Sequence, residues 1–299
     1  MSGPSCLGVE ATSGSRILLP IDAISRPPHG DRASSAFYVR SGEGFEATAL
    51  TRGPWDAGAQ HAGPAAALVG RAIERLDGVG PEPERRLVGR ITLEILAPIP
   101  IAPVAVSAEV VRPGRRIDLV EATMRDADGQ PLIRARGWRL LRRSIPLPAG
   151  LAPRSHPEPP PPEGLERNDR FFPSGHDVGY HTAMEGRFAS GSFLEPGPAT
   201  AWVRMRHPLV AGEEPTPLQR VLIAADSGNG ISAALDFERW IFVNVDLTVH
   251  LSRMPDGEWV CLDSVTVPGR EGIGLTDTVL RDERGPIGLA AQTLLVAPR

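Results

Sequence analysis

The two halves of this sequence carry the same order of secondary-structure signals, and that repetition restricts the fold more than any other feature. Each half has short strand-like runs, one amphipathic helix and then several runs in which apolar and polar residues alternate. The helices are expected over 63–76, with Gly78 and Gly80 as a stop signal, and from Pro217 onward. One helix among many strands predicts an α+β unit in each half, with a sheet packed on the helix.

Matched turns support a duplication. Asp126–Gly129 and Asp282–Gly285 both separate the last two strands expected in their half. Arg136 follows Gly129 by the same number of residues as Gln292 follows Gly285, so the two positions match. His61-Ala62-Gly63 likewise aligns with Asp226-Ser227-Gly228. We therefore expect two diverged copies of one domain, which can build a single site at their shared interface. The strands are expected at 37–39, 45–50, 87–96, 102–111, 117–125, 132–141, 182–193, 199–205, 240–251, 259–268, 272–281 and 287–296.

A proline-dense stretch separates the two copies. It includes the run Pro159–Pro162, and such a composition favours an extended, stiff linker over a packed core. We expect an N-terminal domain over 36–143, a linker over 144–167 and a C-terminal domain over 168–299. The residues before about Ser35 are rich in Ser, Gly and Pro, and we expect them to form a loose arm that, like the linker, stays out of the core.

Composition and charge argue against several classes of protein. An apolar fraction of 41% with 23% charged residues is ordinary for a soluble globular chain, and a net charge of −4 argues against a nucleic-acid partner. Two cysteines, Cys6 and Cys261, do not suggest a disulfide framework. The N-terminus lacks a basic start followed by an apolar run, and no stretch approaches about 18 apolar residues, so we expect no membrane span and a cytoplasmic protein.

The second helix carries a carboxylate where an apolar residue is expected. Thr216–Gln219 reads as a helix start, with a capping hydroxyl and proline at the first helical position. Leu218, Leu222 and Ala225 then recur at helical spacing, which places Asp226 on the buried face. A buried carboxylate without partners is unfavourable, so Asp226 needs hydrogen-bond donors or a function.

Polar residues also mark two strands of the second half. Strict alternation places four of them on one face of the strand 242–251: Asn244, Asp246, Thr248 and His250. A sheet with one solvated face explains most of these four. Gln292 is the one polar residue on its face of the last strand, and a buried amide needs partners. Asp226 and Asn244 are candidates if the fold brings the three together.

These residues resemble a known family, the double hotdog acyl-CoA thioesterases, close to bacterial acyl-CoA thioesterase II. The resemblance covers residues from about 37 to 298 and is strongest over four segments: 224–226, 244–251, 257–259 and 288–292. It implies a tandem (double) hotdog, in which each half wraps an antiparallel sheet around a central helix. The halves of such a protein pair into one continuous sheet, and acyl-CoA thioesters are hydrolysed at their interface.

The resemblance also implies a set of water-binding residues. The family's helix aspartate falls on Asp226 and its last-strand glutamine on Gln292. The family's Ser or Thr position is Asn244 here, so the sequence departs from the thioesterase II pattern. An amide can still hold a water, and Thr248 is the nearest hydroxyl on that strand face. Further association of the sheets into a homo-oligomer is also compatible with the family.

The residues themselves support general-base chemistry. Asp226 can orient and deprotonate a water that Gln292 and Asn244 hold. The backbone N–H of Gly63, at the start of the first helix, is our choice of oxyanion donor, because a helix N-terminus presents unpaired N–H groups. His61 precedes that helix and either lines the pocket or caps and packs. The sequence contains no G-x-S-x-G motif, which argues against a serine nucleophile on an α/β-hydrolase fold.

Two other functions stay open. A hydratase or dehydratase on the same fold would require His61 and Asp226 to meet across the interface, and a non-catalytic protein would only bind the acyl thioester. We expect no cofactor. His176, Asp177 and His181 could be read as metal ligands, but no cysteine or third histidine supports that interpretation, so we expect no metal. The expected partner is acyl-CoA or a related acyl thioester.

Overall fold

The computed structural model describes residues 35–299 apart from 77–85, 151–156, 169–170 and 173. Three of the expected features lie outside the described residues: the N-terminal arm with Cys6, the helix stop signal at Gly78 and Gly80, and the middle of the linker. Ser34–Arg299 form one compact unit. None of the helices in the described part of the chain has the length and apolar composition needed to cross a membrane.

The described elements follow the expected order closely. The first half contains β1 (Tyr38–Ser41), β2 (Gly44–Ala47), the 3-10 turn η1 (Ala49–Thr51), α1 (Ala62–Glu74), β3 (Arg86–Ile95), β4 (Pro103–Arg112), β5 (Ile117–Arg125) and β6 (Pro131–Leu141). The second half contains η3 (Pro162–Gly164), α2 (Tyr180–Ala183), β7 (Met184–Ser192), β8 (Glu195–Met205), α3 (Pro217–Ala225), α4 (Gly228–Ile231), β9 (Trp240–Asn244), β10 (Asp246–Leu251), β11 (Val260–Pro268), β12 (Ile273–Asp282) and β13 (Gly285–Pro298).

The strands of both halves join into one antiparallel sheet. Its order is β1-β2-β4-β5-β6-β3-β10-β13-β12-β11-β8-β7, with β9 paired to the end of β13. The junction lies between β3 and β10, where Asp246 to His250 pair with Glu94 to Arg90. The turns Asp126–Gly129 and Asp282–Gly285 connect β5 to β6 and β12 to β13, as expected. A continuous sheet therefore fixes the two halves relative to each other.

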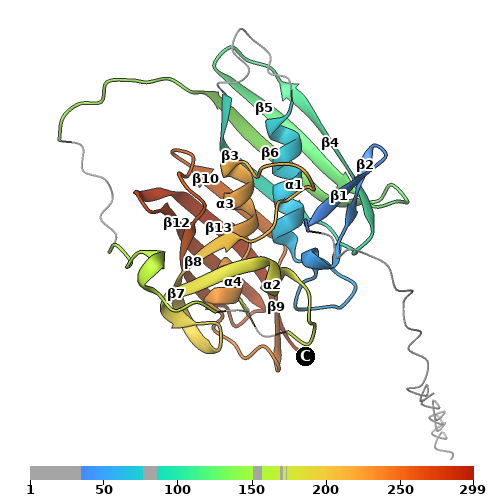
Figure 1. Ribbon diagram of the computed structural model, residues 1–299, viewed down its shortest axis with the longest axis vertical. Helices are drawn as coiled ribbons and strands as arrows, with labels where there is room; N and C mark the ends of the chain where they lie inside the picture. The colour runs from blue at the N-terminus through green and yellow to red at the C-terminus, as the bar shows by residue number, and fades with distance from the viewer. Residues whose placement is uncertain (1–34, 77–85, 151–156, 169–170, 173) are drawn as a thin grey trace, which may run out of the picture. The chain divides into compact units, whose positions relative to one another are not determined.

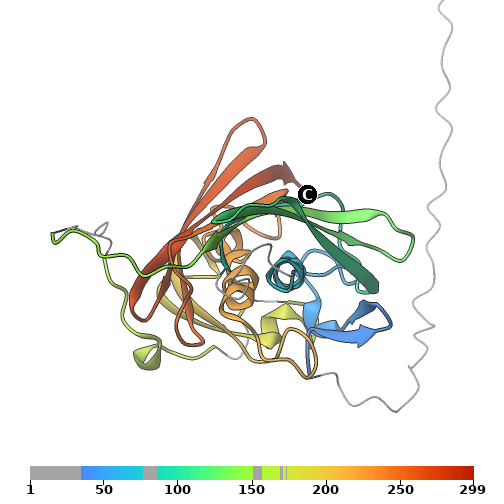
Figure 2. The ribbon, with the colours of Figure 1, turned by 90° about the horizontal axis from the view of Figure 1, so that it is seen from above.

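The two main helices lie side by side against the same side of this sheet (Figures 1 and 2). They run antiparallel, because Gly63 at the start of α1 adjoins Ile223 near the end of α3. At the opposite end, Thr216 Oγ1 donates a hydrogen bond of 2.6 Å to Glu74 Oε2. The small residues of α1 permit this approach: a side chain added at Gly63 would come within 2.5 Å of the Ile223 carbonyl oxygen.

The core lies between the helices and the sheet. The predicted apolar stripe of the first helix is buried there, including Ala65, Leu68, Val69 and Ile73. Burial of such side chains is the main favourable contribution to folding. The helices begin as their sequences predict: His61 caps α1 by accepting from Gly63 N, and Thr216 caps α3 by accepting from Gln219 N.

The strand predicted over 240–251 is broken. It divides at Val245 into β9 and β10, and Val245 itself is 45% exposed. An irregular residue in a strand changes which face the next side chains occupy, because strand side chains alternate with a period of two. The common face expected for Asn244 and Thr248 is therefore wrong: Asn244 contacts Asp226, whereas Thr248 contacts Thr92 of β3.

Two positional matches between the halves are also wrong. Arg136 is exposed on β6 and pairs with Glu121, whereas Gln292 is buried. A one-residue offset in a strand is enough to turn a side chain to the other face. His61 is the N-cap of α1, whereas Asp226 is the C-cap of α3, so the two do not occupy equivalent positions.

The last part of the linker packs on the sheet, contrary to the expectation that the whole linker stays out of the core. Trp202 Nε1 donates a hydrogen bond of 2.9 Å to the Pro160 carbonyl oxygen, and Pro162 is buried. Leu165 packs on a small apolar cluster of Trp202, Trp259 and Cys261. A proline-rich segment can still contribute backbone carbonyls and apolar rings to such contacts, even without regular secondary structure.

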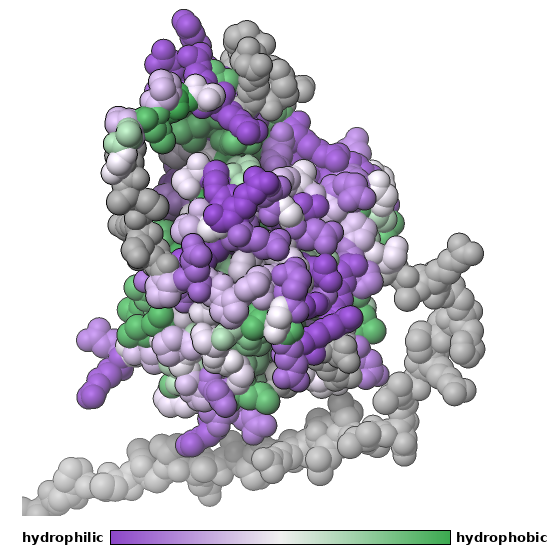
Figure 3. All heavy atoms as spheres, turned by 60° about the vertical axis from the view of Figure 1, so that its left-hand side comes forward, coloured by the Kyte–Doolittle hydropathy of each residue, from purple (hydrophilic) through white to green (hydrophobic). Residues whose placement is uncertain are grey.

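The face of the molecule that Figure 3 shows is mostly hydrophilic, with smaller groups of apolar residues among the hydrophilic ones.

Candidate active site

Asp226 lies where α3 ends and α4 begins, and its side chain is 4% exposed. Its Oδ1 accepts a hydrogen bond of 2.9 Å from Asn244 Nδ2. Its Oδ2 lies 2.9 Å from Nδ1 of His61, which belongs to the first half. The structure thus brings together a carboxylate from one half and an imidazole from the other. The buried carboxylate has the partners that its position in the sequence required.

His61 has two neighbours at the same ring nitrogen. Its Nδ1 lies 3.1 Å from the backbone N of Gly63 and 2.9 Å from Asp226. A ring nitrogen either donates or accepts a hydrogen bond. Nδ1 therefore accepts from Gly63 N–H in one tautomer and donates to Asp226 in the other. If Nδ1 carries the proton, it donates to Asp226, Nε2 keeps its lone pair, and the Gly63 N–H is released from the imidazole.

Gln292 binds the backbone around Asp226 rather than its carboxylate. Its Nε2 donates to the Asp226 carbonyl oxygen at 3.2 Å, and its Oε1 accepts from Asn229 N at 3.1 Å. Gly228 adjoins this amide, because a side chain there would come within 3.1 Å of Gln292 Oε1. Asp226, Asn244 and Gln292 do come together as expected. Gln292 stabilises the break between α3 and α4, which orients the carboxylate.

Tyr180 is a buried member of the site that we did not single out from the sequence. Its ring stacks on the His61 imidazole, with centroids 3.8 Å apart and an interplanar angle of 5°. Its hydroxyl donates to the Ile223 carbonyl oxygen at 2.7 Å and lies 2.8 Å from Ser227 Oγ. Burial raises the pKa of Tyr180, and the Asp226 charge raises it further, so the phenol keeps its proton. No local motif marks this residue, since α2 has only four residues.

The surroundings of His61 include two pockets that share part of their walls. Beside His61, Ser227 and Asn229 is a narrow pocket of about 30 Å³ with aromatic walls. The aromatic side chains that line it are Trp55, Phe171, Phe172, Phe193, Phe237 and Phe242. A wider cavity of about 500 Å³ shares Phe193, Phe237 and Phe242 with this pocket. Concave, mainly apolar surfaces with a few polar groups at one end are typical of small-molecule sites.

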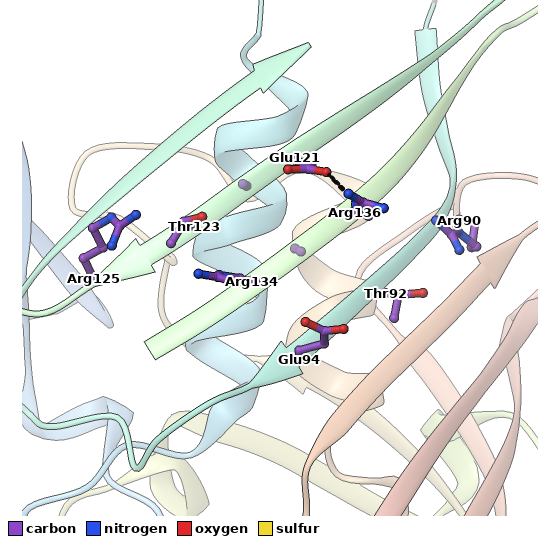
Figure 4. Close-up of a pocket in the computed structure, with 10 residues that line it drawn as sticks. Arg90, Thr92, Glu94, Glu121, Thr123, Arg125, Arg134 and Arg136 are labelled. Atoms are coloured by element: carbon purple, nitrogen blue, oxygen red, sulfur yellow. Dashed lines mark hydrogen bonds and ion pairs between the residues drawn. The ribbon is translucent and has the colours of Figure 1, made fainter. Parts of the chain in front are cut away.

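Thr248 lies away from this pocket. Its Oγ1 is 3.2 Å from Thr92 Oγ1. Thr92 lines a separate polar cavity of about 540 Å³ whose walls include Arg90, Arg134 and Arg136. Figure 4 shows the side chains that line this cavity on β3, β5 and β6, with α1 on the other side of the strands. Thr248 therefore does not provide the hydroxyl that Asn244 lacks.

The residues considered as metal ligands have other contacts. His181 Nε2 lies 2.9 Å from the His176 carbonyl oxygen, and His181 is buried. Within the part of the chain that the structure describes, no group of three or more His, Cys, Asp or Glu side chains is arranged to hold a metal ion.

The fold has counterparts among solved structures. A hot dog fold protein from Alicyclobacillus acidocaldarius superposes with a TM-score of 0.66 at 17% identity, over 89% of this chain and 97% of that chain. A candidate thioesterase II from Thermobifida fusca gives 0.67 at 20% identity, over 89% and 97%. The TesB protein of Mycobacterium avium subspecies paratuberculosis gives 0.61 at 15%, over 87% and 96%. This protein therefore has the hotdog fold.

Family models identify the sequence more narrowly. The acyl-CoA thioesterase N-terminal domain matches residues 51–140, and the acyl-CoA thioesterase C-terminal domain matches residues 153–296. No curated protein matches the sequence. The two matches together span most of the chain, so the chain belongs to the acyl-CoA thioesterase family.

Proposed function

We propose that this protein hydrolyses acyl-CoA, or a related acyl thioester, to the free acid and the thiol. The observation that carries the proposal is the contact of 2.9 Å between His61 and Asp226, beside an apolar pocket in a member of this family. Thioester hydrolysis needs a deprotonated water, donors for the oxyanion and a surface for the acyl group. Residues around the pocket can supply all three.

In this proposal Asp226 and His61 activate the water as a pair. Both oxygens of Asp226 already have partners, whereas His61 lines the pocket. The carboxylate accepts a hydrogen bond from Nδ1–H, and Nε2 takes a proton from the water as the water oxygen attacks the thioester carbonyl carbon. The C–S bond of the tetrahedral intermediate then breaks, and the leaving thiolate takes the proton from Nε2. The products are the acid and the free thiol.

The other expected site residues have supporting roles. Asn244 holds Asp226 through a direct hydrogen bond, and Gln292 holds the helix break. With Nδ1 protonated, the Gly63 N–H is available to the oxyanion at the positive end of α1. The apolar cavity of about 500 Å³ is suited to the acyl group.

Hydration of an enoyl thioester is a second candidate function. It is favoured by the same His61–Asp226 contact, because addition of water to a double bond also needs a paired base and acid. The two reactions are distinguished by the product: hydrolysis releases a thiol, whereas hydration consumes the conjugated double bond and leaves the thioester intact.

Release of free thiol from a panel of acyl-CoAs tests the proposal. Asp226→Asn keeps the shape of the side chain and removes its charge, so we expect kcat to fall by about 10²–10⁴-fold. His61→Gln should fall over the same range, and Gln292→Ala by less because Gln292 positions rather than reacts. Asp277→Asn and His250→Gln are matched controls on exposed strand positions and should keep full activity.

Each outcome of this panel has a distinct meaning. Loss of activity in Asp226→Asn but not in His61→Gln would assign the proton directly to Asp226 and leave the thioesterase proposal standing. Wild-type protein that releases no thiol but hydrates crotonyl-CoA would replace it with the second candidate. Wild-type protein that binds acyl-CoA and does neither would make it an acyl-thioester-binding protein.

We also propose that the molecule is a double hotdog, with tandem domains over 36–143 and 168–299 and a linker over 144–167. The order of strands supports this division, because each half contributes a run of neighbouring strands to the sheet. The contact between α1 and α3 supports a shared interface, at which His61 and Asp226 meet.

A further inference from the structure

Tyr180 contacts the imidazole of His61 and also the end of the helix that carries Asp226. It is fully buried, and its ring lies parallel to the imidazole at van der Waals distance. A parallel ring on one face limits rotation of the imidazole about its bond to Cβ. That rotation decides whether a nitrogen or a carbon of the ring faces Asp226, since a flip would place Cδ2 where Nδ1 now lies beside Oδ2.

The hydroxyl of Tyr180 acts on the carboxylate side. In a continuing α-helix the Ile223 carbonyl would accept from Ser227 N, but Ser227 N bonds to the Ala224 carbonyl oxygen at 2.9 Å instead. The Ile223 carbonyl is left without its helical partner, and Tyr180 Oη donates to it at 2.7 Å. This bond stabilises the helix break at which Asp226 sits.

The backbone of Tyr180 is fastened to the loop that carries His61. Tyr180 N donates to the Arg52 carbonyl oxygen at 2.9 Å, and His61 N donates to the neighbouring Thr51 carbonyl oxygen at 2.7 Å. Arg52 also donates through its side chain to the Val178 carbonyl oxygen at 2.9 Å. One short segment of the first half thus holds the main chains of both stacked residues.

We propose that Tyr180 is the positioning residue that keeps Nδ1 of His61 on Asp226, through its ring on the imidazole and through its hydroxyl on the end of α3. The inference rests on the proposed function only for its kinetic readout. Tyr180 does not line the pocket beside His61, so its loss should lower kcat and leave KM unchanged.

Three variants test this role. Tyr180→Phe keeps the stacking ring and removes the hydroxyl, so kcat should fall about tenfold. Tyr180→Leu removes both, and kcat should fall by about 10²-fold, the scale of a small misplacement of catalytic groups. Tyr38→Phe is the matched control, because Tyr38 is the other tyrosine of the chain, is fully buried and also donates a hydrogen bond, to Gln60. It should keep wild-type kcat and KM.

The ¹⁵N NMR shifts of the His61 ring give a readout independent of activity, with His61→Gln to assign them. We expect one tautomer in the wild type, Tyr180→Phe and Tyr38→Phe, and a mixture of two in Tyr180→Leu. A wild type that hydrolyses no thioester would end the proposed function, yet these shifts would still decide the role of Tyr180. A mixture in the wild type, or wild-type kcat in Tyr180→Phe, would overturn the inference. If Tyr180→Leu does not fold, Tyr180→Phe alone decides it.

Discussion

At the scale of single residues, Glu213 joins three arginines from two other elements. Its carboxylate pairs with Arg71 at 2.7 Å, with Arg75 at 2.8 Å and with Arg40 at 3.0 Å. The hydrogen bond from Arg71 holds the pKa of Glu213 below its ordinary value, although partial burial opposes this. Glu213 therefore links the segment before α3 to α1 and β1.

Glu213→Gln should make the fold less stable in a way that depends on pH. The folded pKa is below the unfolded one, so the stabilisation is present above the unfolded pKa of about 4.3 and is lost as pH falls through the folded pKa. We expect the free energy of unfolding to drop by about 1.5–3 kcal/mol at neutral pH, the usual contribution of hydrogen bonds to charged groups. Urea unfolding at several pH values measures this.

Glu214→Gln is the matched control, because Glu214 is exposed and adjacent in sequence. It should unfold like the wild type at every pH. A constant difference between Glu213→Gln and wild type down to acid pH would contradict the assigned cause.

The sequence predicted the carboxylate of the site better than its surroundings. Helical periodicity alone placed Asp226 on a buried face, and the structure agrees. Periodicity failed for Thr248, because the irregular residue Val245 interrupts the strand and reverses the face to which the following side chains point. Tyr180 was not predictable, since its contacts join residues more than forty positions apart and depend on tertiary packing.

At the scale of elements, α1 has glycine at two positions where it contacts α3. An added methyl at Gly63 would meet the backbone oxygen of Ile223 at 2.5 Å, and a backbone atom cannot move without moving its helix. An added methyl at Gly70 would meet the end of the Leu222 side chain, which can change rotamer. The two positions should therefore respond differently to the same substitution.

Gly63→Ala should separate the start of α1 from the end of α3 and draw His61 away from Asp226. We expect thioester hydrolysis to fall by about 10–10²-fold, with a lower melting temperature. Gly70→Ala should keep its activity, because the gain in helix propensity of about 1 kcal/mol offsets the local repacking. Activity and thermal unfolding of both variants check this, and equal activities would argue that the helix contact does not set the site geometry.

Most elements could be predicted because their signals are local. The caps of α1 and α3, the alternating strands and the two matched turns all depend on residues close in sequence. The exceptions are short elements such as α2 and α4 and the division of 240–251 into two strands. These depend on contacts across the sheet, which no local pattern records.

At the scale of the whole molecule, β3 and β10 turn two sheets into one. Neither strand would be an edge in the intact protein, but each becomes one if the halves separate. Exposed edge strands pair with other chains and aggregate. The α1–α3 contact would be exposed by the same separation.

A chain divided after Ala149 should behave accordingly. Each piece expressed alone should be insoluble or self-associated, because its junction strand and helix face are uncovered. The two pieces expressed together should form a complex with one copy of each and retain thioester hydrolysis. Size-exclusion chromatography with light scattering measures the complex, and a soluble, folded single piece would contradict the prediction.

The order of elements in the two halves could be predicted at this scale, but the way in which the halves meet could not. The sequence indicated two units of similar order and a linker between them. Pairing between β3 and β10 joins residues about 156 positions apart, as the Thr92–Thr248 contact shows. Packing of Leu165 depends on a surface formed by Trp202, Trp259 and Cys261, which are also distant from it in sequence. Such contacts are set by the assembled core.

The antiparallel helix pair has two corners, and each joins the N-cap of one helix to a carboxylate at the end of the other. One corner holds His61 and Asp226, and the other holds Thr216 and Glu74. Burial raises the pKa of Glu74, while its bonds to Thr216 and Gln219 lower it in part. The two corners thus have the same arrangement of a capping side chain and a carboxylate, and both hold the helix pair together. For enzyme engineering, a second reaction centre at the Thr216–Glu74 corner would start from a helix N-cap and a partly buried carboxylate that are already in contact.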